Sequence, residues 1–544
     1  MYSLPMIITG HIIDPLNRRR YSGTIDIVDG RIASIQEHDV EDGPFILPGF
    51  VDAHIHIESS MLTPYEFARM ALPHGTVATI SDPHEIANVC GMEGVLYMLE
   101  NARKTPLKFH FGAPSCVPAT TFETAGAEIT AEDIEVLFRD HGLIYLAEMM
   151  NYPGVLHRDP MVMRKIDTAK KYNRRIDGHA PGLRGKDAAD YIAAGISTDH
   201  ECFTREEALD KLSNGMKILI REGSAARNFD ALIPLMRTHP DELMFCSDDK
   251  HPDDLEVGHI DRLVSRSIRQ GYDLFDVLRA ASVNPVLHYG LDVGLLRVGD
   301  RADFILVDDL QDFKVRRTVI NGVIVAENGE ASLQKGSHPI INNFNCTPKS
   351  PADFKINSSG KNVHLIEALD GQLITKRLTV PAKVVNGELL SDPANDQLKV
   401  AVVNRYKDAP PAMGMIKNIG IRRGAIASTV AHDSHNIIAS GCSDEEICRA
   451  VNLLIRCKGG LCVVDGDEEL VLPLPIAGLI SDQDGISVSQ AYSALDKKVK
   501  QIGSTLRAPY MTLSFMALLV IPEFKMSDLG LFDAINFKFA DLTD

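Results

Sequence analysis

The sequence predicts an α/β protein whose centre is a closed (β/α)8 TIM-like barrel, with a small β-sandwich domain formed from both flanks and a separate C-terminal α+β domain. Three features of the 544 residues support this prediction. Apolar segments of β character alternate with helical patterns. Short strands and turns lie on both sides of this alternating region, and a second mixture of strands and helices follows a polar stretch.

The alternating region contains eight segments with the length and apolar character of parallel barrel strands. They cover residues 50–57, 77–81, 108–112, 143–149, 175–178, 196–198, 217–220 and 243–246. We therefore expect a barrel over residues 49–284. An open, doubly wound sheet is the alternative, but no G-x-G-x-x-G turn follows the first segment.

The flanks of the barrel have the short strands and tight turns of a small sheet. Before the barrel, strands are predicted at 6–9, 24–28 and 31–36, and after it at 303–307, 315–320 and 323–326. Neither flank is long enough to bury a core alone. We expect residues 1–48 and 285–335 to pair into one composite β domain.

The region after the second flank divides into two parts. Residues 336–360 are rich in Asn, Pro, Ser and Gly and have weak periodicity, which predicts a linker. A C-terminal domain is expected over 361–544, with strands at 398–404 and 461–465 and helices at 443–455 and 487–501.

Composition limits the partners of the chain. A net charge of −18 would repel phosphate backbones, so we expect no nucleic-acid partner. No run of about 18 apolar residues could span a bilayer, and the first ten residues lack the pattern of a signal peptide. Nine cysteines without C-x-x-C pairs argue against a disulfide framework and a thiolate zinc site. We expect a cytoplasmic protein without a membrane partner that acts on a small, uncharged molecule or holds a cationic metal.

The strongest local motif is the H-x-H of His54 and His56 in the first barrel segment. Side chains two residues apart in a strand point to the same side, so both imidazoles could bind one cation. An isolated H-x-H in an apolar strand is more often structural. Four further candidate ligands end later strands of the barrel, at the edge where barrel active sites are built: Glu148, His179, His200 and Asp248. Each of these four residues alone is more simply a hydrogen-bonded polar residue at a strand end. The convergence of all six residues on one edge of the barrel favours a metal site.

This ligand pattern resembles that of the binuclear amidohydrolase superfamily. Many members carry a carbamylated lysine on strand four, where this chain has Glu148. More specific phrases resemble the adenine deaminase family and extend the resemblance over nearly the whole chain. These phrases cover residues 56–64, 81–89, 247–255 and 432–438. The resemblance implies hydrolytic deamination of adenine to hypoxanthine and ammonia in purine salvage, by a hydroxide that two metal ions activate.

The resemblance also implies a division of the ligands between two divalent metals. One metal is expected on His54, His56 and Asp248, the second on His179 and His200, and Glu148 across both. Imidazole and carboxylate ligands without thiolate suit Mn2+, Fe2+ or Zn2+, and the resemblance favours Mn2+.

Proton transfer requires further groups. We expect Asp248 to take a proton during attack and to pass it to the departing nitrogen. Asp82 and Glu85 are the candidates for protonating or hydrogen-bonding the purine ring, with Asp249 and His84 as substrate-binding residues behind them. The alternative for 82–85 is an ordinary helix start, with Asp82 as the N-cap, and both roles can coexist.

Two histidines of the C-terminal domain, His432 and His435, are further candidates for substrate binding. They could reach the barrel mouth as part of a lid, or they could belong to a polar loop satisfied within its own domain.

Two alternative functions and one question of assembly remain open. The same metal platform could serve a hydrolase acting on another nucleobase or a cyclic amide, since fold and ligands do not select the substrate. A metal-free scaffold is the alternative from another class, although no ligand is missing from the sequence. We also expect a homo-oligomer.

Overall fold

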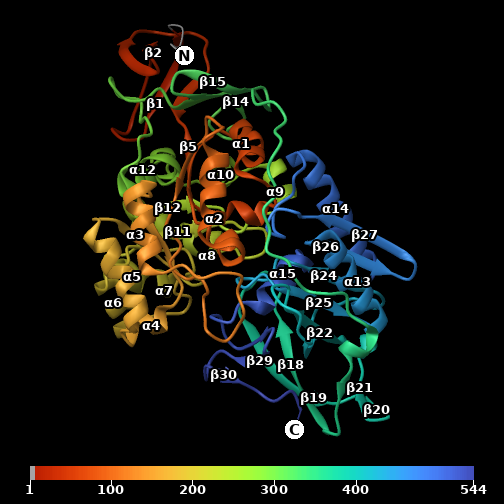
Figure 1. The fold of residues 1–544 in the computed structure, drawn as a ribbon. Coiled ribbons are helices and arrows are strands. Elements are labelled where there is room, and N and C mark those ends of the chain that lie inside the picture. The colour runs from red at the N-terminus through yellow and green to blue at the C-terminus, as the bar shows by residue number, and fades with distance from the viewer. Residues whose placement is uncertain (1–5, 544) are drawn as a thin grey trace.

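The structure is a computed structural model that describes residues 6–543. Residues 1–5 of the predicted β domain and residue 544 of the predicted C-terminal domain lie outside the described part. Figure 1 shows the small sheet domain above the barrel and the C-terminal domain beside and below it.

The barrel is built from eight parallel strands, each at one of the predicted segments. They are β5 (Phe50–Ile55), β6 (Thr76–Ser81), β7 (Lys108–Phe111), β8 (Tyr145–Met149), β9 (Arg175–Gly178), β10 (Thr198–Asp199), β11 (Lys217–Arg221) and β12 (Leu243–Cys246). Parallel bridges join the separate groups of strands, and the bridge between Ile55 and Asp248 links the first strand to the end of the last. The sheet is therefore closed, and the open-sheet alternative is wrong.

Helices cover the outside of this barrel because one side of each is apolar. In α10 the buried residues Ile260, Leu263, Val264 and Ser267 follow the helical period, whereas Arg262 and Arg269 face outward. The helices of this region are α1 (Pro64–Ala71), α2 (His84–Ala102), α3 (Ala131–Asp140), α4 (Tyr152–Leu156), α5 (Pro160–Lys171), α6 (Gly185–Ala193), α7 (Arg205–Ser213), α8 (Phe229–Leu232), α9 (Pro252–Val257), α10 (Ile260–Arg269), α11 (Leu274–Leu278) and α12 (Asn284–Tyr289).

The two flanks form one sheet of eight strands in the order β16-β15-β14-β13-β4-β1-β2-β3. The strands are β1 (Met6–Asp14), β2 (Arg19–Val28), β3 (Arg31–Glu37), β4 (Phe45–Pro48), β13 (Phe304–Val307), β14 (Val315–Ile320), β15 (Val323–Glu327) and β16 (Glu330–Ala331). Strand β4 joins the halves, since it pairs parallel with β1 and antiparallel with β13.

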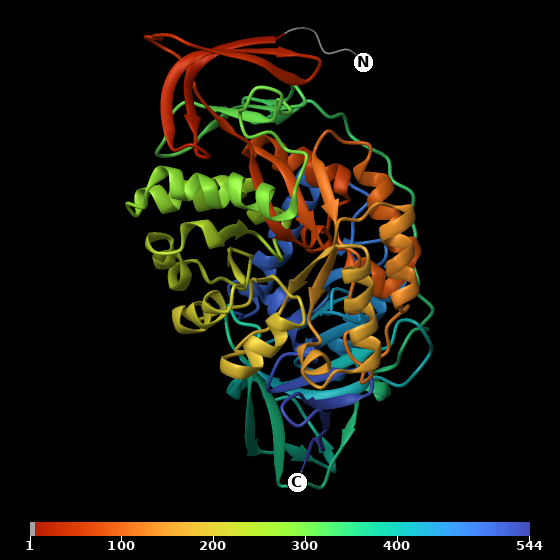
Figure 2. The same ribbon diagram turned by 90° about the vertical axis from the view of Figure 1, so that its left-hand side faces the viewer.

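Figure 2 shows the N-terminal strands (red) lying over the strands that follow the barrel (green). Ile25 of the first half and Val319 of the second belong to the same buried core. The predicted sandwich is thus a single hydrogen-bonded sheet that folds over its own core.

The stretch 336–360 crosses from the small sheet to the C-terminal domain along the surface of the barrel. His338 is buried and lies 3.0 Å from the Asn101 amide nitrogen of α2. Near its end, β17 (Ile356–Asn357) pairs with β21 (Glu388–Leu389) of the C-terminal domain. The predicted linker is therefore packed along much of its length.

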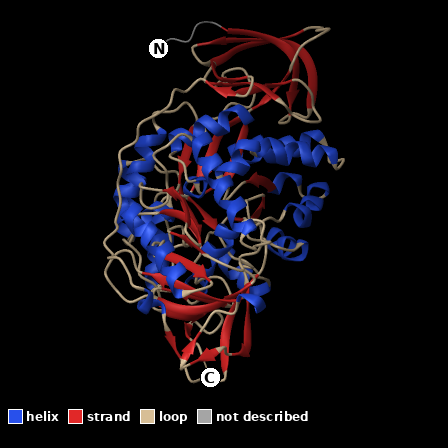
Figure 3. Cartoon of the chain, turned by 90° about the vertical axis from the view of Figure 1, so that its right-hand side faces the viewer, coloured by secondary structure: helices blue, strands red, loops and turns tan. Residues whose placement is uncertain are grey.

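The C-terminal domain has a mainly antiparallel sheet of eight strands with helices packed on it, as Figure 3 shows at the lower end of the molecule. In spatial order the strands are β19 (Thr375–Pro381), β18 (Asn362–Ala368), β23 (Ala412–Lys417), β22 (Gln397–Val403), β25 (Ile437–Gly441), β24 (Ala425–Ser428), β26 (Gly460–Asp465) and β27 (Glu468–Pro473). The main helices are α13 (Asp444–Cys457), α14 (Gly485–Gln501) and α15 (Pro509–Ser514), and a small sheet follows with β28 (Phe524–Ser527), β29 (Gly530–Asp533) and β30 (Lys538–Phe539).

The predicted strands and helices of this domain are found as β22, β26, α13 and α14. Helix α14 packs against α9, which joins the domain to the barrel. Among residues 6–543, no helix is both long enough and apolar enough to cross a membrane.

A buried polar cluster holds the first and last barrel strands together. Asp52 of β5 accepts hydrogen bonds from the Ser247 backbone nitrogen (3.0 Å) and from His259 Nε2 (2.7 Å). His259 Nδ1 lies 2.6 Å from Thr76 Oγ1, and burial lowers the pKa of His259. A neutral imidazole therefore donates to Asp52 and accepts from Thr76, so every buried polar atom in the chain of bonds has a partner.

We predict that Asp52→Ala destabilises the barrel by about 2–3 kcal/mol, because Ser247 and His259 lose a charged acceptor while remaining buried. For a domain of this size the thermal midpoint should fall by roughly 4–12 °C. Calorimetry of the metal-free variant measures the effect without a contribution from metal loss. Asp42→Ala, at an exposed position, is the control, and an equal midpoint for the two variants would contradict the role of the cluster.

Candidate metal centre and active site

The six residues predicted as metal ligands meet at the end of the barrel where the strands reach their carboxyl ends. Each is no more than 5% exposed. His54 lies in β5, Glu148 lies in β8, and the others directly follow β5, β9, β10 and β12: His56, His179, His200 and Asp248. The barrel thus brings together residues that are up to about 200 positions apart in the sequence.

The first group consists of His54, His56 and Asp248. The Nε2 atoms of the two histidines lie 3.2 Å apart, and they lie 3.4 and 3.3 Å from Asp248 Oδ1. Asp248 has a backbone φ of 55°, in the left-handed region that few residues other than glycine adopt. Such a conformation is costly and is typical of functional sites, where the surrounding structure holds it in place.

The Glu148 carboxylate spans the distance between this group and a second one. Its Oε1 lies 3.4 Å from His56 Nε2, whereas its Oε2 lies 3.0 Å from His179 Nδ1 and 3.1 Å from His200 Nε2. Oε1 therefore faces His56, whereas Oε2 faces His179, His200 and, at 3.8 Å, His54. This arrangement is suited to a carboxylate that bridges two cations.

Two buried residues that the sequence analysis did not identify complete this region. Arg221, at the end of β11, donates to Glu201 Oε2 at 2.9 Å and to Asp248 Oδ2 at 2.6 Å. Glu201 Oε1 lies 3.5 Å from His179 Nδ1 and 3.3 Å from His200 Nε2. The sequence does contain a signal for this pair, because an acid directly follows His200 and an arginine ends an apolar strand. A buried arginine requires acidic partners, so the two residues were candidates for such a pair.

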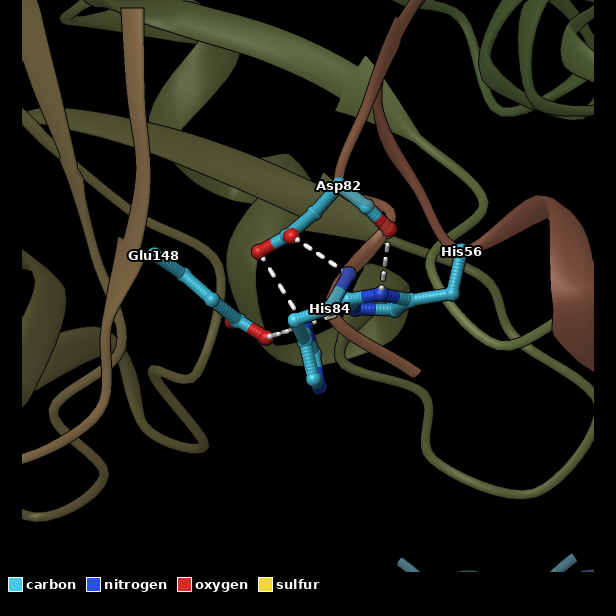
Figure 4. A group of neighbouring side chains, drawn as sticks. All are labelled: His56, Asp82, His84 and Glu148. Carbon is cyan, nitrogen blue, oxygen red and sulfur yellow. Dashed lines mark hydrogen bonds and ion pairs between the residues drawn. The ribbon is translucent and has the colours of Figure 1, made fainter. Parts of the chain in front are cut away.

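Asp82 and His84 extend the cluster on the side of β6 (Figure 4). His84 Nδ1 lies 3.1 Å from Asp82 Oδ2 and 3.6 Å from Glu148 Oε1. Asp82 Oδ1 also accepts a hydrogen bond from the His84 backbone nitrogen at 3.0 Å, which is a local contact at the start of α2. Helix α2 begins at His84 with Pro83 as its N-cap and no side-chain cap, so the prediction of Asp82 as the N-cap is wrong. Asp82 instead bonds the first helical residue and faces the predicted metal ligands.

Glu85 turns away from its own helix and contacts the C-terminal domain. Its Oε1 lies 2.5 Å from His432 Nδ1, and its Oε2 contacts His435 Nε2. Asp433 approaches the same region, with Oδ1 3.7 Å from His84 Nε2. The loop 432–435 therefore reaches the mouth of the barrel instead of being satisfied within its own domain.

A cavity lies between the ligand cluster and the C-terminal domain. Asp249 and His432 line it, and Ser59 Oγ donates to Asp249 Oδ1 at 2.5 Å. Apolar side chains of both domains form another part of its wall: Met150, Leu373, Phe515 and Leu518. The cavity thus combines acidic groups with an apolar surface, as a small aromatic ligand would require.

Buried Lys525 fixes the apolar part of this wall. Its Nζ donates to the carbonyl oxygens of Leu373 (2.6 Å) and Phe515 (2.9 Å), and burial lowers the pKa of Lys525 to about 7. Lys525 therefore ties two separate segments of the C-terminal domain together beside the cavity.

The charges of the cluster favour occupation by cations. Burial opposes the ionisation of Glu148 and Asp248, yet His179 holds the pKa of Glu148, and Arg221 holds the pKa of Asp248, well below the usual carboxyl range. Burial would also lower the pKa of His56, but Asp248 and Glu148 raise it well above its usual value. The carboxylates thus draw positive charge to the imidazoles, and divalent ions would take the place of these protons.

The number and grouping of the donor atoms also fit metal ions. Six carboxylates line the cavity, and His179 Nε2 is buried without a hydrogen-bond partner in residues 6–543. Among the groups of donor atoms close enough to hold one ion are those of His54, His56 and Asp248, of His54, Glu148 and His200, and of His179, His200 and Glu201. Oxygen and imidazole donors of this kind suit divalent transition metals.

Comparison with known proteins gives two matches that follow one another along the chain. The Amidohydrolase family matches residues 45–325, and the Adenine deaminase C-terminal domain matches residues 372–538. A protein of Sulfurovum sp. (strain NBC37-1) named adenine deaminase is 55% identical, over 98% of this chain and 99% of its own length. The chain belongs to the adenine deaminase family.

Other members of the family are similar over their full length. Proteins named adenine deaminase from Salinibacter ruber and Methanosarcina barkeri are each 52% identical, over 98% of this chain and 98% of their own. Membership of the family agrees with the resemblance found in the sequence and extends to both the barrel and the C-terminal domain.

We predict that His54→Ala or His56→Ala lowers bound metal by about one equivalent and reduces turnover by roughly 10²-fold or more, since even partners outside the ligand shell cost 10–100-fold. Elemental analysis after purification and a steady-state assay measure the two effects. The control is His157→Ala, which removes an exposed imidazole. Full metal occupancy and normal turnover in the His54 and His56 variants would exclude these residues as ligands.

Proposed function

We propose that this chain catalyses the hydrolytic deamination of adenine, giving hypoxanthine and ammonia. The observation that carries the proposal is the full-length similarity to proteins named adenine deaminase, together with the cluster of histidines and carboxylates at the barrel mouth. A hydrolase for another nucleobase or a cyclic amide is not favoured, because the C-terminal match is specific to adenine deaminases.

In this proposal two divalent cations, with Mn2+ favoured over Fe2+ and Zn2+, are held by the six ligands. His54, His56 and Asp248 would hold one, His179 and His200 the other, and Glu148 both. When bound, such ions lower the pKa of a water molecule towards about 7, which makes a nucleophile available at neutral pH.

Asp248 is proposed to move the proton. Arg221 binds Oδ2 at 2.6 Å and keeps the carboxylate ionised, so Oδ1, which faces the predicted metal position, is the oxygen that would accept a proton from the attacking water. A carboxyl group with so low a pKa is a strong acid once protonated, and it would pass the proton on to the departing nitrogen.

Glu85 and Asp82 are proposed to act on the purine ring, with Asp249 and His84 binding it. Protonation of a ring nitrogen, or a hydrogen bond that stabilises the proton there, makes the carbon that bears the amino group more electrophilic and disperses the charge that develops during attack. Burial opposes the ionisation of Glu85, but His432 and His435 hold its pKa well below the usual carboxyl range, which suits the hydrogen-bonding role. His432 raises the local positive charge beside Glu85, and Glu85 in turn raises the pKa of His432 to about 9 against the effect of burial. His432 and His435 therefore hold Glu85 in one orientation, which supports a role of this pair in the site.

The apolar wall is proposed to receive the face of the base. Leu373, Phe515 and Leu518 come from the C-terminal domain, so the barrel alone would leave the site open to water. Excluding water strengthens the interactions between the acidic groups and the substrate.

A deamination assay across adenine, adenosine, guanine and cytosine tests the proposed substrate. We expect release of ammonia from adenine at a kcat/KM at least about 10³-fold above that for the other compounds, because a site built for ring nitrogens rejects analogues that leave its buried polar groups unpaired. Comparable rates with guanine or cytosine, or none with adenine in the metal-loaded enzyme, would overturn the assignment.

The proton-transfer role of Asp248 can be separated from ligation. An amide in Asp248→Asn can still coordinate through its oxygen but cannot accept a proton at neutral pH. We predict a rate reduced by roughly 10²-fold or more even at saturating Mn2+, with a change in the acidic limb of the pH–rate profile. Asp230→Asn, at a position whose side chain is 75% exposed, is the control. Recovery to the wild-type rate on adding Mn2+ would remove the proton-transfer role and leave the metal site intact.

A cytoplasmic location and self-association remain proposals. Neither is needed for the chemistry above, because every residue invoked belongs to one chain.

A further inference from the structure

A second cavity lies beside the catalytic one, near the carboxyl ends of β11 and β12. It is bounded by the loops that follow these strands, by α9 and α10, and by residue 507 of the C-terminal domain. None of its lining residues lines the catalytic cavity. They are Glu222, Arg227, Lys250, Asp254, Val257, Gly258, Arg262, Leu263, Arg266 and Arg507.

Positive charge collects at this cavity in a protein whose net charge is −18. Five of the lining residues are cationic and two are acidic. Lys250 is only 8% exposed, yet within residues 6–543 its ammonium group makes no hydrogen bond and no ion pair. A buried lysine without a partner is costly, which indicates that its partner is not part of the chain.

Two arginines at the cavity are also poorly compensated. Arg507 is exposed, and in the described part of the chain its guanidinium group has no acidic partner. Arg227 approaches Glu222 and Asp254 only at 3.5 Å. Burial lowers the pKa of Arg227, and repulsion from Arg507 lowers it further, whereas Glu222 raises it.

The two acidic groups nearby have closer partners than Arg227. Glu222 pairs with Arg266 at 3.0 Å, and Asp254 accepts a hydrogen bond from Ser224 Oγ at 2.6 Å. Arg266 also pairs with Asp230 at 2.6 Å. The charges of Lys250, Arg227 and Arg507 are therefore left to face the cavity.

We propose that this cavity binds a phosphate group, either as inorganic phosphate or as part of a phosphomonoester. Arginine presents N–H donors in a planar fork that fits two phosphate oxygens, and lysine adds a point charge. The loops after the seventh and eighth strands are also where barrels of this fold frequently bind phosphate.

The site would connect parts of the molecule that are otherwise separate. Lys250 directly follows Asp248 and Asp249, Arg227 belongs to the preceding barrel loop, and Arg507 belongs to the C-terminal domain. A phosphate held by all three would tie the C-terminal domain to the segment that carries the proposed catalytic aspartate. The proposal concerns binding alone and does not depend on the identity of the substrate.

Isothermal titration of the metal-loaded protein with inorganic phosphate and with ribose 5-phosphate, at ionic strength matched with KCl, tests the proposal. We expect one phosphate per chain with a Kd below about 1 mM, the weak end of specific binding. Binding of phosphate alone would identify the inorganic ion, and binding of both would show that an ester is accepted. Absence of binding by either, or a response no larger than that to KCl, would overturn the proposal.

Substitutions of the arginines at the cavity test whether phosphate binds there. Arg227→Gln and Arg507→Gln should each weaken phosphate binding roughly 10-fold or more, since each removes a charge-assisted hydrogen bond. Arg269→Gln is the matched control on α10, because its side chain is 55% exposed and pairs with Asp312 outside the cavity. Thermal unfolding should show a phosphate-dependent rise in midpoint for the wild type and for Arg269→Gln. Unchanged affinity in Arg227→Gln and Arg507→Gln would exclude this cavity as the site.

Discussion

The concentration of buried negative charge at the barrel mouth is the constraint on which the rest of the site depends. Six buried carboxylates line one cavity, and such groups are costly unless cations or donors surround them. Arg221 pairs with Glu201 and Asp248 but supplies one positive charge for the two, while His432 and His435 enclose Glu85. Glu148, Asp249 and Asp433 add further negative charge, and Glu148 lies among imidazoles that face it. This uncompensated charge is what metal ions suit.

This constraint also explains why two domains are needed. The barrel supplies the six predicted ligands, but the shortest contacts of Glu85 are with His432 and His435 of the C-terminal domain, which also provides the apolar wall with Leu373 and Phe515. Lys525 holds that wall by donating to two backbone carbonyls and not by contacting the cavity. The C-terminal domain thus contributes both charge compensation and exclusion of water, and the site is formed at the interface.

Much of this arrangement could be predicted from the sequence, because the barrel converts strand ends into neighbours. The positions of His54, Glu148 and Asp248 followed from period-two strands and from polar residues that end apolar segments. The pair formed by Glu201 and Arg221 did not, because each has an ordinary local explanation and only the closed sheet brings them together. The resemblance over 432–438 made His432 and His435 candidates for the barrel mouth, but their contact with Glu85 could not be predicted, since domain docking leaves no periodic signal in the chain. The turns and strand lengths of the two flanks were enough to predict that they form one domain. They could not predict that β4 joins the two halves into one sheet, because local patterns do not encode which residues of β1, β4 and β13 pair.

The position of β4 in that sheet has a consequence for how the protein is made. Strands β1 to β4 are synthesised before the barrel, but the second partner of β4 in the sheet, β13, is synthesised only after it. Until then Ile25 and Ile46 lack the covering side chains Phe304 and Val319, so the apolar face of the nascent sheet stays open while the barrel forms. Pairings between such distant segments form slowly and leave unpaired edges exposed. The strands before the barrel therefore wait for native partners from the synthesis of residue 48 until that of residue 304, and the nascent chain exposes an apolar face during this interval.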